Sequence, residues 1–516
     1  MLSRFAVVSA MAGAGAVLAF VAYQLWSLDT QYLVAIVAAI VLASFSMVFL
    51  PRFPDFLLVT MFCSIPLASF NKSFFFIPWV HGAAAKSVMR YSGIVSVAVP
   101  DILLTALYII WGFKIIALRT APLPHLQRAD VFPLLLVLAY MCSIPGSAYP
   151  TAAVFGLYYL VQHVLYYFYL SRHVEIKHFP WIVLAVCFAI VPEAVLGVFQ
   201  YLSGKLLSLA WTRGAASGDI NQQYVVPGIE NIKRATGTLF DSHSFGIYMA
   251  MLTGFPFVMA LRRFARPASR IFWGLNFVIA CMANVLSFSR SAWASVAIAL
   301  ILVWGVHLIW GQRQILLPTV LFALLLLILS PLYVPLIYER ISSAGPKLLT
   351  GRFEQFPVAW DMWKDHFLFG AGVGNYMDLL KYYNRPGVLV LPVHNVFLWI
   401  GAESGLLGVV GFFGMLFGAM LRCWRVAMRQ REPVCVLALA VLGALLAYFL
   451  DGLTDPLFRE PTVYLMFWVC IGLSAALVRI DAELPGARGS ARVSQRGNDR
   501  HAVSVPRAVS APPPER

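Results

Sequence analysis

Three arginines and one histidine of this 516-residue chain have side chains that could do chemistry together. Arg234, Arg290 and Arg352 carry guanidinium groups, which stay charged near lipid and match the oxygens of a phosphate with paired N–H donors. His394 carries an imidazole, which near neutral pH can take a proton from a hydroxyl group. The set suits a transfer in which a diphosphate leaves and a hydroxyl attacks. The ordinary alternative for each arginine is contact with lipid headgroups at a helix end.

Two further ionisable residues are secondary candidates for the same site. His243 lies in the segment Asp241-Ser242-His243-Ser244, directly before an apolar run. Glu403 follows His394 by nine residues, which at about 100° per residue places it on the opposite face of a helix. Hydrogen bonding between helices is therefore the favoured role for Glu403. The other acids in or beside apolar runs are Glu193, Asp451 and Asp455.

The polar segments around these candidates contain no Asp-x-Asp pair of the kind that holds a metal ion. Arginines can neutralise a leaving diphosphate without a metal, because they supply positive charge where the negative charge develops. The pattern therefore predicts a site with no metal and no cofactor.

The elements that must position these residues are membrane-spanning helices. Apolar residues make up 60% of the chain and charged residues 12%, which argues against a soluble enzyme and excludes a disordered protein and a disulfide scaffold. Since a bilayer core needs roughly 20 apolar residues per helix, we predict an all-α fold, a polytopic transmembrane bundle of about 12–14 spans. The apolar segments are 5–26, 32–50, 54–70, 98–117, 131–147, 151–170, 180–203, 240–261, 269–287, 291–310, 314–337, 394–420, 433–452 and 461–479.

Lysine and arginine set the predicted orientation. The short loops 262–266 and 422–425 are rich in arginine and fall on the same side of the predicted bundle. Because positively charged loops stay in the cytoplasm, we assign this side to the cytoplasm, together with both termini. The long segments 71–97, 204–239 and 338–393, and with them the candidate residues, then face outward. Topology accounts for most of the net charge of +15, so no nucleic-acid partner is needed.

The chain divides into two predicted parts. Residues 1–480 form the integral-membrane helical domain, which includes the outer loop 338–393. Residues 481–516 are rich in Arg, Ser and Pro, a composition typical of a disordered tail, here on the cytoplasmic side.

The outer loop 338–393 contains an aromatic stripe. Its members recur at spacings of three and four residues, which predicts one face of a helix; they are Phe353, Phe356, Trp360, Trp363 and Phe367. Such a helix would either lie in the membrane interface or pack on the ends of the spanning helices. Glycines at 370, 372 and 374 are expected to end it with a sharp return.

Four short blocks follow one another between about residues 230 and 420. They read RATGTLF from Arg234, SRSA from Ser289, FGAGVGNY from Phe369, and HNVFL from His394 with AESGLLG from Ala402. In this order, with a large outer loop before the last block, they resemble the O-antigen ligase and polymerase superfamily of bacterial inner-membrane glycan enzymes.

The resemblance implies a membrane glycosyltransferase that moves a glycan from undecaprenyl diphosphate to a hydroxyl acceptor on the periplasmic side of the inner membrane. Arg234 and Arg290 match the family positions that contact the diphosphate, Arg352 matches the arginine that opens the loop helix, and His394 matches the proposed base. The implied partners are the lipid-linked glycan donor, a glycan or lipid A core acceptor, and membrane lipid.

The acceptor stays open, because ligases, polymerases and protein O-glycosylating transferases share the core pattern. The family often has His-Pro-Asn where this chain has Ser242-His243-Ser244. Ligation to lipid A core and polymerisation of a surface or exopolysaccharide are the two leading alternatives.

A transporter for a lipid-linked glycan is the rival from another class. It would need a polar cavity at the bilayer midplane and a repeated half. The predicted midplane is poor in charge, no internal repeat is visible, and polar residues gather at one boundary. These features favour an enzyme.

Overall fold

The computed structural model describes most of the predicted helices. The described residues are 52–69, 72–76, 94–122, 124–203, 225–226, 229–239, 241–262, 266–312, 353–383, 392–456 and 460–484, with the single residues 316, 334, 338 and 385. The predicted spans 5–26 and 32–50 lie outside the described residues, and of 314–337 only 316 and 334 are described. Arg352 and residues 485–516 also lie outside the described residues.

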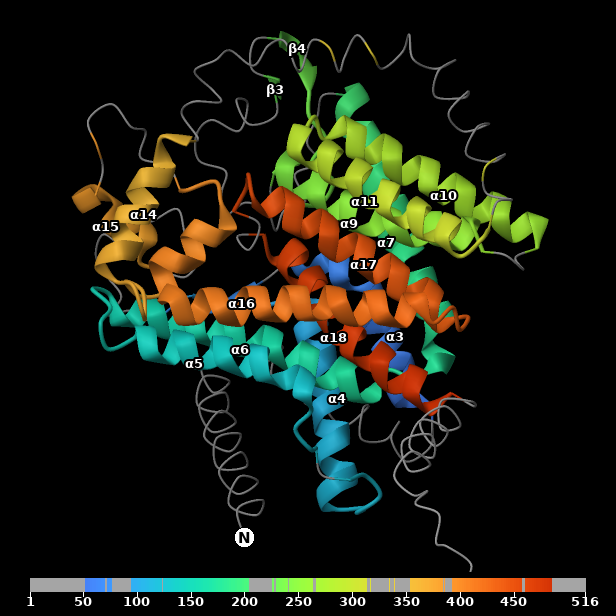
Figure 1. The fold of residues 1–516 in the computed structure, drawn as a ribbon, viewed down its shortest axis with the longest axis horizontal. Helices are drawn as coiled ribbons and strands as arrows, with labels where there is room; N and C mark the ends of the chain where they lie inside the picture. The colour runs from blue at the N-terminus through green and yellow to red at the C-terminus, as the bar shows by residue number, and fades with distance from the viewer. Residues whose placement is uncertain are drawn as a thin grey trace, which may run out of the picture.

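Long apolar helices dominate the described part of the chain (Figure 1). Nine helical segments there are long and apolar enough to cross a membrane, which confirms the predicted polytopic helical fold. They are α4 (Val99–Ile116), α6 (Pro150–His173), α7 (Phe179–Ser203, preceded by a 3₁₀ turn Ile176–His178), α9 (Ser242–Ala260), α10 (Pro267–Leu286), α11 (Arg290–Ile309), α16 (Val396–Met428), α17 (Val434–Gly452) and α18 (Pro461–Glu483).

Two predicted spans are shorter than the expected length. Helix α3 (Phe53–Cys63) covers 11 residues before a 3₁₀ turn (Ile65–Ser69), and α5 (Val131–Ser143) covers 13. At 1.5 Å per residue they reach about 17 and 20 Å, less than a bilayer core of about 30 Å. Prolines at 66 and 145 follow closely and cannot continue a helix. The prediction that 54–70 and 131–147 each span as one α-helix was therefore wrong.

Two short antiparallel strand pairs lie in the segments that were predicted to face outward. β1 (Lys72–Phe76) pairs with β2 (Ile94–Val97), and β3 (Val225–Val226) pairs with β4 (Ile229–Lys233). The second pair leads directly into the first candidate residue, Arg234.

Helices α17 and α18 form the centre of the bundle. Within their membrane-length windows 83% and 89% of the residues are buried, against 22% in α4 and 33% in α10 and α11. Figure 1 shows α17 between α16 and the group α9–α11, while α5 and α6 run beside α16. The peripheral helices expose apolar side chains, as helices that face lipid do.

Helix α16 is broken at Gly405, where φ is +66°. The break frees backbone donors, and a return loop supplies their acceptors: Leu406 N donates to Phe367 O (2.8 Å) and Leu407 N to Leu368 O (3.3 Å). This loop follows α14 (Gln355–Asp365) and leads to α15 (Tyr376–Tyr383). The third and fourth sequence blocks therefore form one structural unit.

The boundary predicted at residue 480 lies too early. Helix α18 continues to Glu483, and the carboxylate of Asp481 is fully buried and paired with Arg429. A second arginine, Arg431, lies 3.8 Å from the same carboxylate. These ion pairs hold the last turn of α18 against the loop after α16, so the helical domain includes it.

Candidate functional site

The segment that carries Arg234 is held by two buried polar side chains of α7. Gln200 Oε1 accepts hydrogen bonds from the backbone N–H groups of Thr236 and Gly237, both at 2.9 Å, and Gln200 Nε2 donates to Gly237 O at 2.9 Å. Seven residues earlier on the same helix, Glu193 accepts from Thr238 N at 2.8 Å and from the Thr238 hydroxyl. Glu193 therefore has a structural role here.

Gly237 explains why this segment needs a glycine. Its φ is +57°, a conformation that side chains disfavour. A Cβ atom at this position would also collide with the Glu193 carboxylate. The Gly of the first sequence block is thus required by the close approach to α7.

Arg234 joins this segment to the turn between α10 and α11. Its side chain is 7% exposed, and its Nε donates to Ser287 O at 3.0 Å. The next residue repeats the link, since Ala235 N donates to Leu286 O at 2.9 Å. The buried guanidinium is therefore fixed beside the second sequence block.

The turn between α10 and α11 places Arg290 at the first position of α11. Ser289 caps this helix by accepting from Ala292 N, and its own N–H donates to Ser287 Oγ at 3.1 Å. Phe288 is buried with φ +51°, a strained conformation that the surrounding contacts maintain. Arg290 is half-buried. Arg234 and Arg290 thus belong to one rigid corner.

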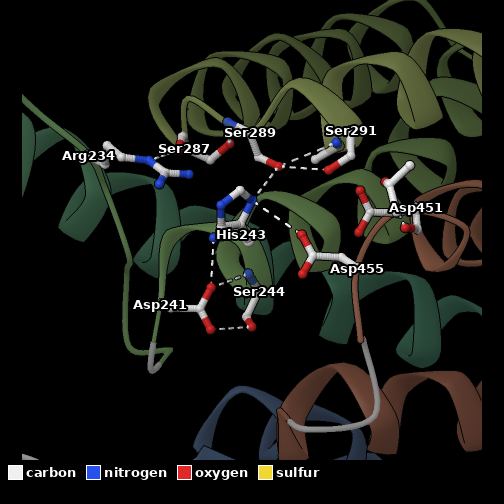
Figure 2. A network of polar contacts seen from close by, with 11 residues as sticks. Arg234, Asp241, His243, Ser244, Ser287, Ser289, Ser291, Asp451 and Asp455 are labelled. Carbon is white, nitrogen blue, oxygen red and sulfur yellow. Dashed lines mark hydrogen bonds and ion pairs between the residues drawn. The ribbon is translucent and has the colours of Figure 1, made fainter. Parts of the chain in front are cut away.

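His243 lies against the same corner (Figure 2). Asp241 caps α9 by accepting from His243 N and Ser244 N, each at 2.8 Å, and so sets the position of the histidine. The ring atom Nδ1 lies 3.2 Å from Ser289 Oγ and 3.4 Å from Asp455 Oδ2. His243 therefore links α9, α11 and the end of α17.

His394 directly precedes the cap residue of α16. Its Nδ1 lies 3.1 Å from Oε1 of Gln355, which is 2% exposed and begins α14. The neighbouring Asn395 caps α16 by accepting from Leu398 N at 2.9 Å and donates to Leu453 O at 3.1 Å. His394 is thus held between the outer loop and the end of α17.

The segment after α17 joins the two histidines. Leu453 O accepts the hydrogen bond of Asn395, and two residues later Asp455 pairs with His243. Hydrogen bonds and short backbone segments therefore connect Arg234, His243 and His394, and Arg290 stands on the turn that Arg234 contacts.

Glu403 lies apart from this chain of contacts. Its Oε1 accepts from Tyr376 N at 3.2 Å, and its backbone carbonyl accepts from Gly372 N at 3.0 Å. Gly370 approaches the Glu403 backbone so closely that a Cβ atom there would collide with it. Glu403 anchors the glycine-rich return loop to α16.

The aromatic stripe of the outer loop is divided in the structure. The buried face of α14 contains Gln355, Val358, Ala359, Met362 and Trp363. Trp363 packs beside Gly401 and Phe397 of α16, whereas Phe353, Trp360 and Phe367 are exposed. The prediction that all five aromatics line one face of a helix was wrong in extent, because α14 includes only Phe356, Trp360 and Trp363, whereas Phe353 precedes the helix and Phe367 follows it. The glycines at 370, 372 and 374 all have positive φ, which suits the predicted sharp return, but they do not end the helix, because α14 already ends at Asp365.

Two residues of the site were not singled out from the sequence, Gln355 and Gln200. A glutamine within a polar loop or near the end of an apolar helix has no distinctive pattern. Asp455 was noted as an acid near a helix end, but its pairing with His243 was not predicted. Among the described residues, no three His, Cys, Asp or Glu side chains gather as metal ligands would.

The fold and the site define a polytopic helical membrane protein in which arginine, histidine and carboxylate side chains meet where α9 and α11 begin and α17 ends. Residues 275–413 match the family model described as O-antigen ligase. The match includes Arg290, the glycine-rich return loop, His394 and Glu403. Residues 275–413 are therefore similar to this family, which confirms the resemblance for the second, third and fourth blocks. A search of curated proteins found no match to the chain.

Proposed function

We propose that this protein is an inner-membrane glycosyltransferase that moves a glycan from undecaprenyl diphosphate to a hydroxyl acceptor on the periplasmic side. The observation that carries the proposal is that the O-antigen ligase domain contains both Arg290 and His394, and that contacts through Leu453 and Asp455 link the His394 end to the Arg234 corner. The proposal places both termini in the cytoplasm.

The arginines bind the donor in this proposal. Arg234 and Arg290, with Arg352 from the start of the outer loop, contact the diphosphate oxygens and stabilise the charge that develops as the diphosphate leaves. Their guanidinium groups stay protonated at any working pH, so the site needs no metal or other cofactor for this role.

His394 acts as the general base. Gln355 Oε1 can only accept a hydrogen bond, so the 3.1 Å contact assigns the ring hydrogen to Nδ1 and leaves the lone pair on Nε2. The acceptor hydroxyl gives its proton to Nε2 while its oxygen forms a bond to the anomeric carbon. The bond from that carbon to the diphosphate oxygen breaks, and undecaprenyl diphosphate leaves with the electron pair.

Ligation to lipid A core and polymerisation of a surface glycan require the same bond change and differ in the acceptor. A bacterial strain that lacks the gene and is complemented with wild-type or His394→Ala protein tests the choice. A ligase restores glycan on lipid A core, and a polymerase restores long chains that remain on the lipid carrier. Failure of the wild-type gene to change either product would contradict the proposal.

A further inference from the structure

We propose that α14 and the return loop (residues 366–375) lie in the lipid interface at the end of the bundle that carries the candidate site. Trp360, Phe367, Leu368 and Phe369 insert there at the boundary between the headgroups and the acyl chains. Such a lipid contact is separate from glycan transfer and does not depend on it. Because α14 begins at Gln355, the contact holds the partner of His394 at the membrane surface.

Three consecutive apolar side chains of the return loop form an exposed patch. Phe367 is 50% exposed, Leu368 56% and Phe369 49%. Residues 366–376 contain no Asp, Glu, Lys or Arg, so no charge accompanies the patch. A contiguous apolar patch on a protein surface marks a contact with another protein or with a membrane.

The patch continues the lipid-facing side of α16. Leu406 N donates to Phe367 O at 2.8 Å and Leu407 N to Leu368 O at 3.3 Å, so the patch adjoins α16 directly after its break. Beyond the break, exposed apolar residues recur along one face of the helix; they are Leu406, Val410, Phe417 and Leu421. The patch therefore extends a surface that faces lipid, and this continuity identifies lipid as its partner.

Helix lengths place the patch at the membrane boundary. At 1.5 Å per residue, residues 406–428 of α16 extend about 35 Å, slightly more than a bilayer core of about 30 Å. Helix α6 has 24 residues and extends about 36 Å. Tyr149, just before α6, donates from its N–H to Asn375 Oδ1 at 2.8 Å. The far ends of both helices therefore meet at the return loop, and Figure 1 shows α14 and α15 at this end of α16.

The opposite ends of these two helices are also level with each other. Arg479 of α18 donates from Nε to Ser171 O near the end of α6 at 3.3 Å. Two residues later on α18, Asp481 pairs with Arg429, which directly follows α16. Two helices thus place the return loop about one bilayer core away from this arginine-rich end.

The backbone of the return loop finds its partners within the protein. The carbonyls of Phe367 and Leu368 accept the two bonds from α16. The N–H groups at 370, 371 and 372 donate to backbone carbonyls at 2.8, 2.8 and 3.0 Å. Non-helical backbone beside the bilayer core requires such partners, because lipid chains offer none. These bonds suit a loop that touches lipid.

Helix α14 has two unlike flanks. At about 100° per residue, Trp360 lies to one side of its buried face, and Asp361 and Asp365 lie to the other. Trp360 is 44% exposed, whereas Asp361 forms ion pairs with Lys364 and Arg385. An aromatic flank toward lipid and a charged flank toward water are typical of a helix that lies in the membrane interface.

Lipid fits the patch better than a glycan does. A sugar needs polar groups in its binding site to bond its hydroxyls and fix its orientation. Phe367, Leu368 and Phe369 have no polar atoms in their side chains. An apolar patch without such groups suits acyl chains, which need none.

The depth of single fluorophores in the membrane tests the proposal. Full-length protein in lipid nanodiscs carries the fluorophore NBD on a cysteine introduced by Trp360→Cys or Phe369→Cys. Asp365→Cys is the matched control, because Asp365 lies on the same helix as Trp360 and on the opposite flank. The seven native cysteines are buried or half-buried, and unsubstituted protein treated in the same way gives their background.

Two quenchers report on the surroundings of the fluorophore. A lipid with a nitroxide near the top of its acyl chain quenches from within the membrane, and iodide quenches from water. We expect NBD at positions 360 and 369 to lose most of its fluorescence to the nitroxide lipid and little to iodide, since an interfacial helix buries its apolar side by about 5–10 Å. NBD at position 365 should show the reverse. Each variant is used only after its size-exclusion profile matches that of wild type.

Two results would overturn the proposal. If iodide quenches NBD at either position 360 or 369 as strongly as at 365, the surface faces water and is open to a glycan. If neither quencher reaches these positions, a protein covers them, such as a second copy of this chain. Both results leave the proposed function untouched, because glycan transfer is not what these fluorophores report.

Discussion

At the residue scale, a substitution of Arg290 can distinguish a role in phosphate binding from contact with lipid headgroups. It begins α11 on a turn that Ser287 and Ser289 hold rigid, so its guanidinium has little freedom to move. We expect Arg290→Lys to lose most of the transfer activity although the charge is kept, because lysine cannot offer two parallel N–H donors to a phosphate. Activity is measured at equal membrane level, with Arg425→Lys at the other end of the bundle as control. A fully active Lys variant would show that Arg290 contacts lipid headgroups and does not need to bind the diphosphate.

His394 is expected to affect the rate and not the binding of the donor. Donor binding depends on the arginines and on burial of the lipid tail, which His394→Ala leaves in place. Loss of a general base costs about 10²–10⁴-fold in rate, since the proton moves only as the hydroxyl attacks.

Rate per folded molecule is the decisive quantity for His394. His125→Ala is the matched control and should keep the wild-type rate. If His394 only orders the start of α16 beside Gln355 and Asn395, the variant would show less protein and a nearly normal rate. A loss below about tenfold per molecule would remove the general-base role.

At the scale of elements, the site depends on how the return loop meets the break in α16. Gly370 has φ +74° and touches the backbone of Glu403. We expect Gly370→Ala to lower the free energy of unfolding by about 2–5 kcal/mol, from the positive φ and from overpacking. Thermal unfolding of the detergent-solubilised protein measures this. Gly274→Ala in α10, where a Cβ meets open space, should change the free energy of unfolding little. Equal effects of the two substitutions would contradict the close packing of the return loop on the break in α16.

The sequence predicts the positions of the spanning helices well, because each needs a long apolar run that can be read without knowing its neighbours. Two features of α16 escaped this reasoning. Hydropathy does not register the dihedral angles at Gly405, so the broken helix reads as a continuous span. The contact of His394 with Gln355 joins residues 39 apart and depends on the path of the outer loop, which no local pattern encodes.

The residues of the candidate site also divide into those that the sequence alone reveals and those that only the packed structure reveals. The arginines and His394 were recognisable because their residue types suggest chemistry in any context. Asp455, Gln200 and Ser289 act through particular partners, and the partners are known only once α7, α9, α11 and α17 are packed together.

At the scale of the whole molecule, orientation decides on which side of the membrane the site works. A reporter that is active only outside the cytoplasm should be active when fused after Gly345 and inactive when fused after Arg429. The reason is that the arginine-rich loops 262–266 and 422–425 favour the cytoplasmic side. The reverse pattern would move all the candidate residues to the cytoplasm and contradict a periplasmic site.

The central claim is that the protein transfers a glycan, and transfer is distinguished from transport in liposomes that contain the purified full-length protein. The donor is an undecaprenyl-diphosphate glycan labelled in its sugar, and it is supplied together with the acceptor. Two amounts are measured: the label that becomes bonded to the acceptor and the undecaprenyl diphosphate that is released. We expect the two amounts to be equal for wild-type protein and both to vanish for His394→Ala. Label that crosses the bilayer while it stays bonded to the lipid, in both proteins alike, would contradict the account and identify a transporter.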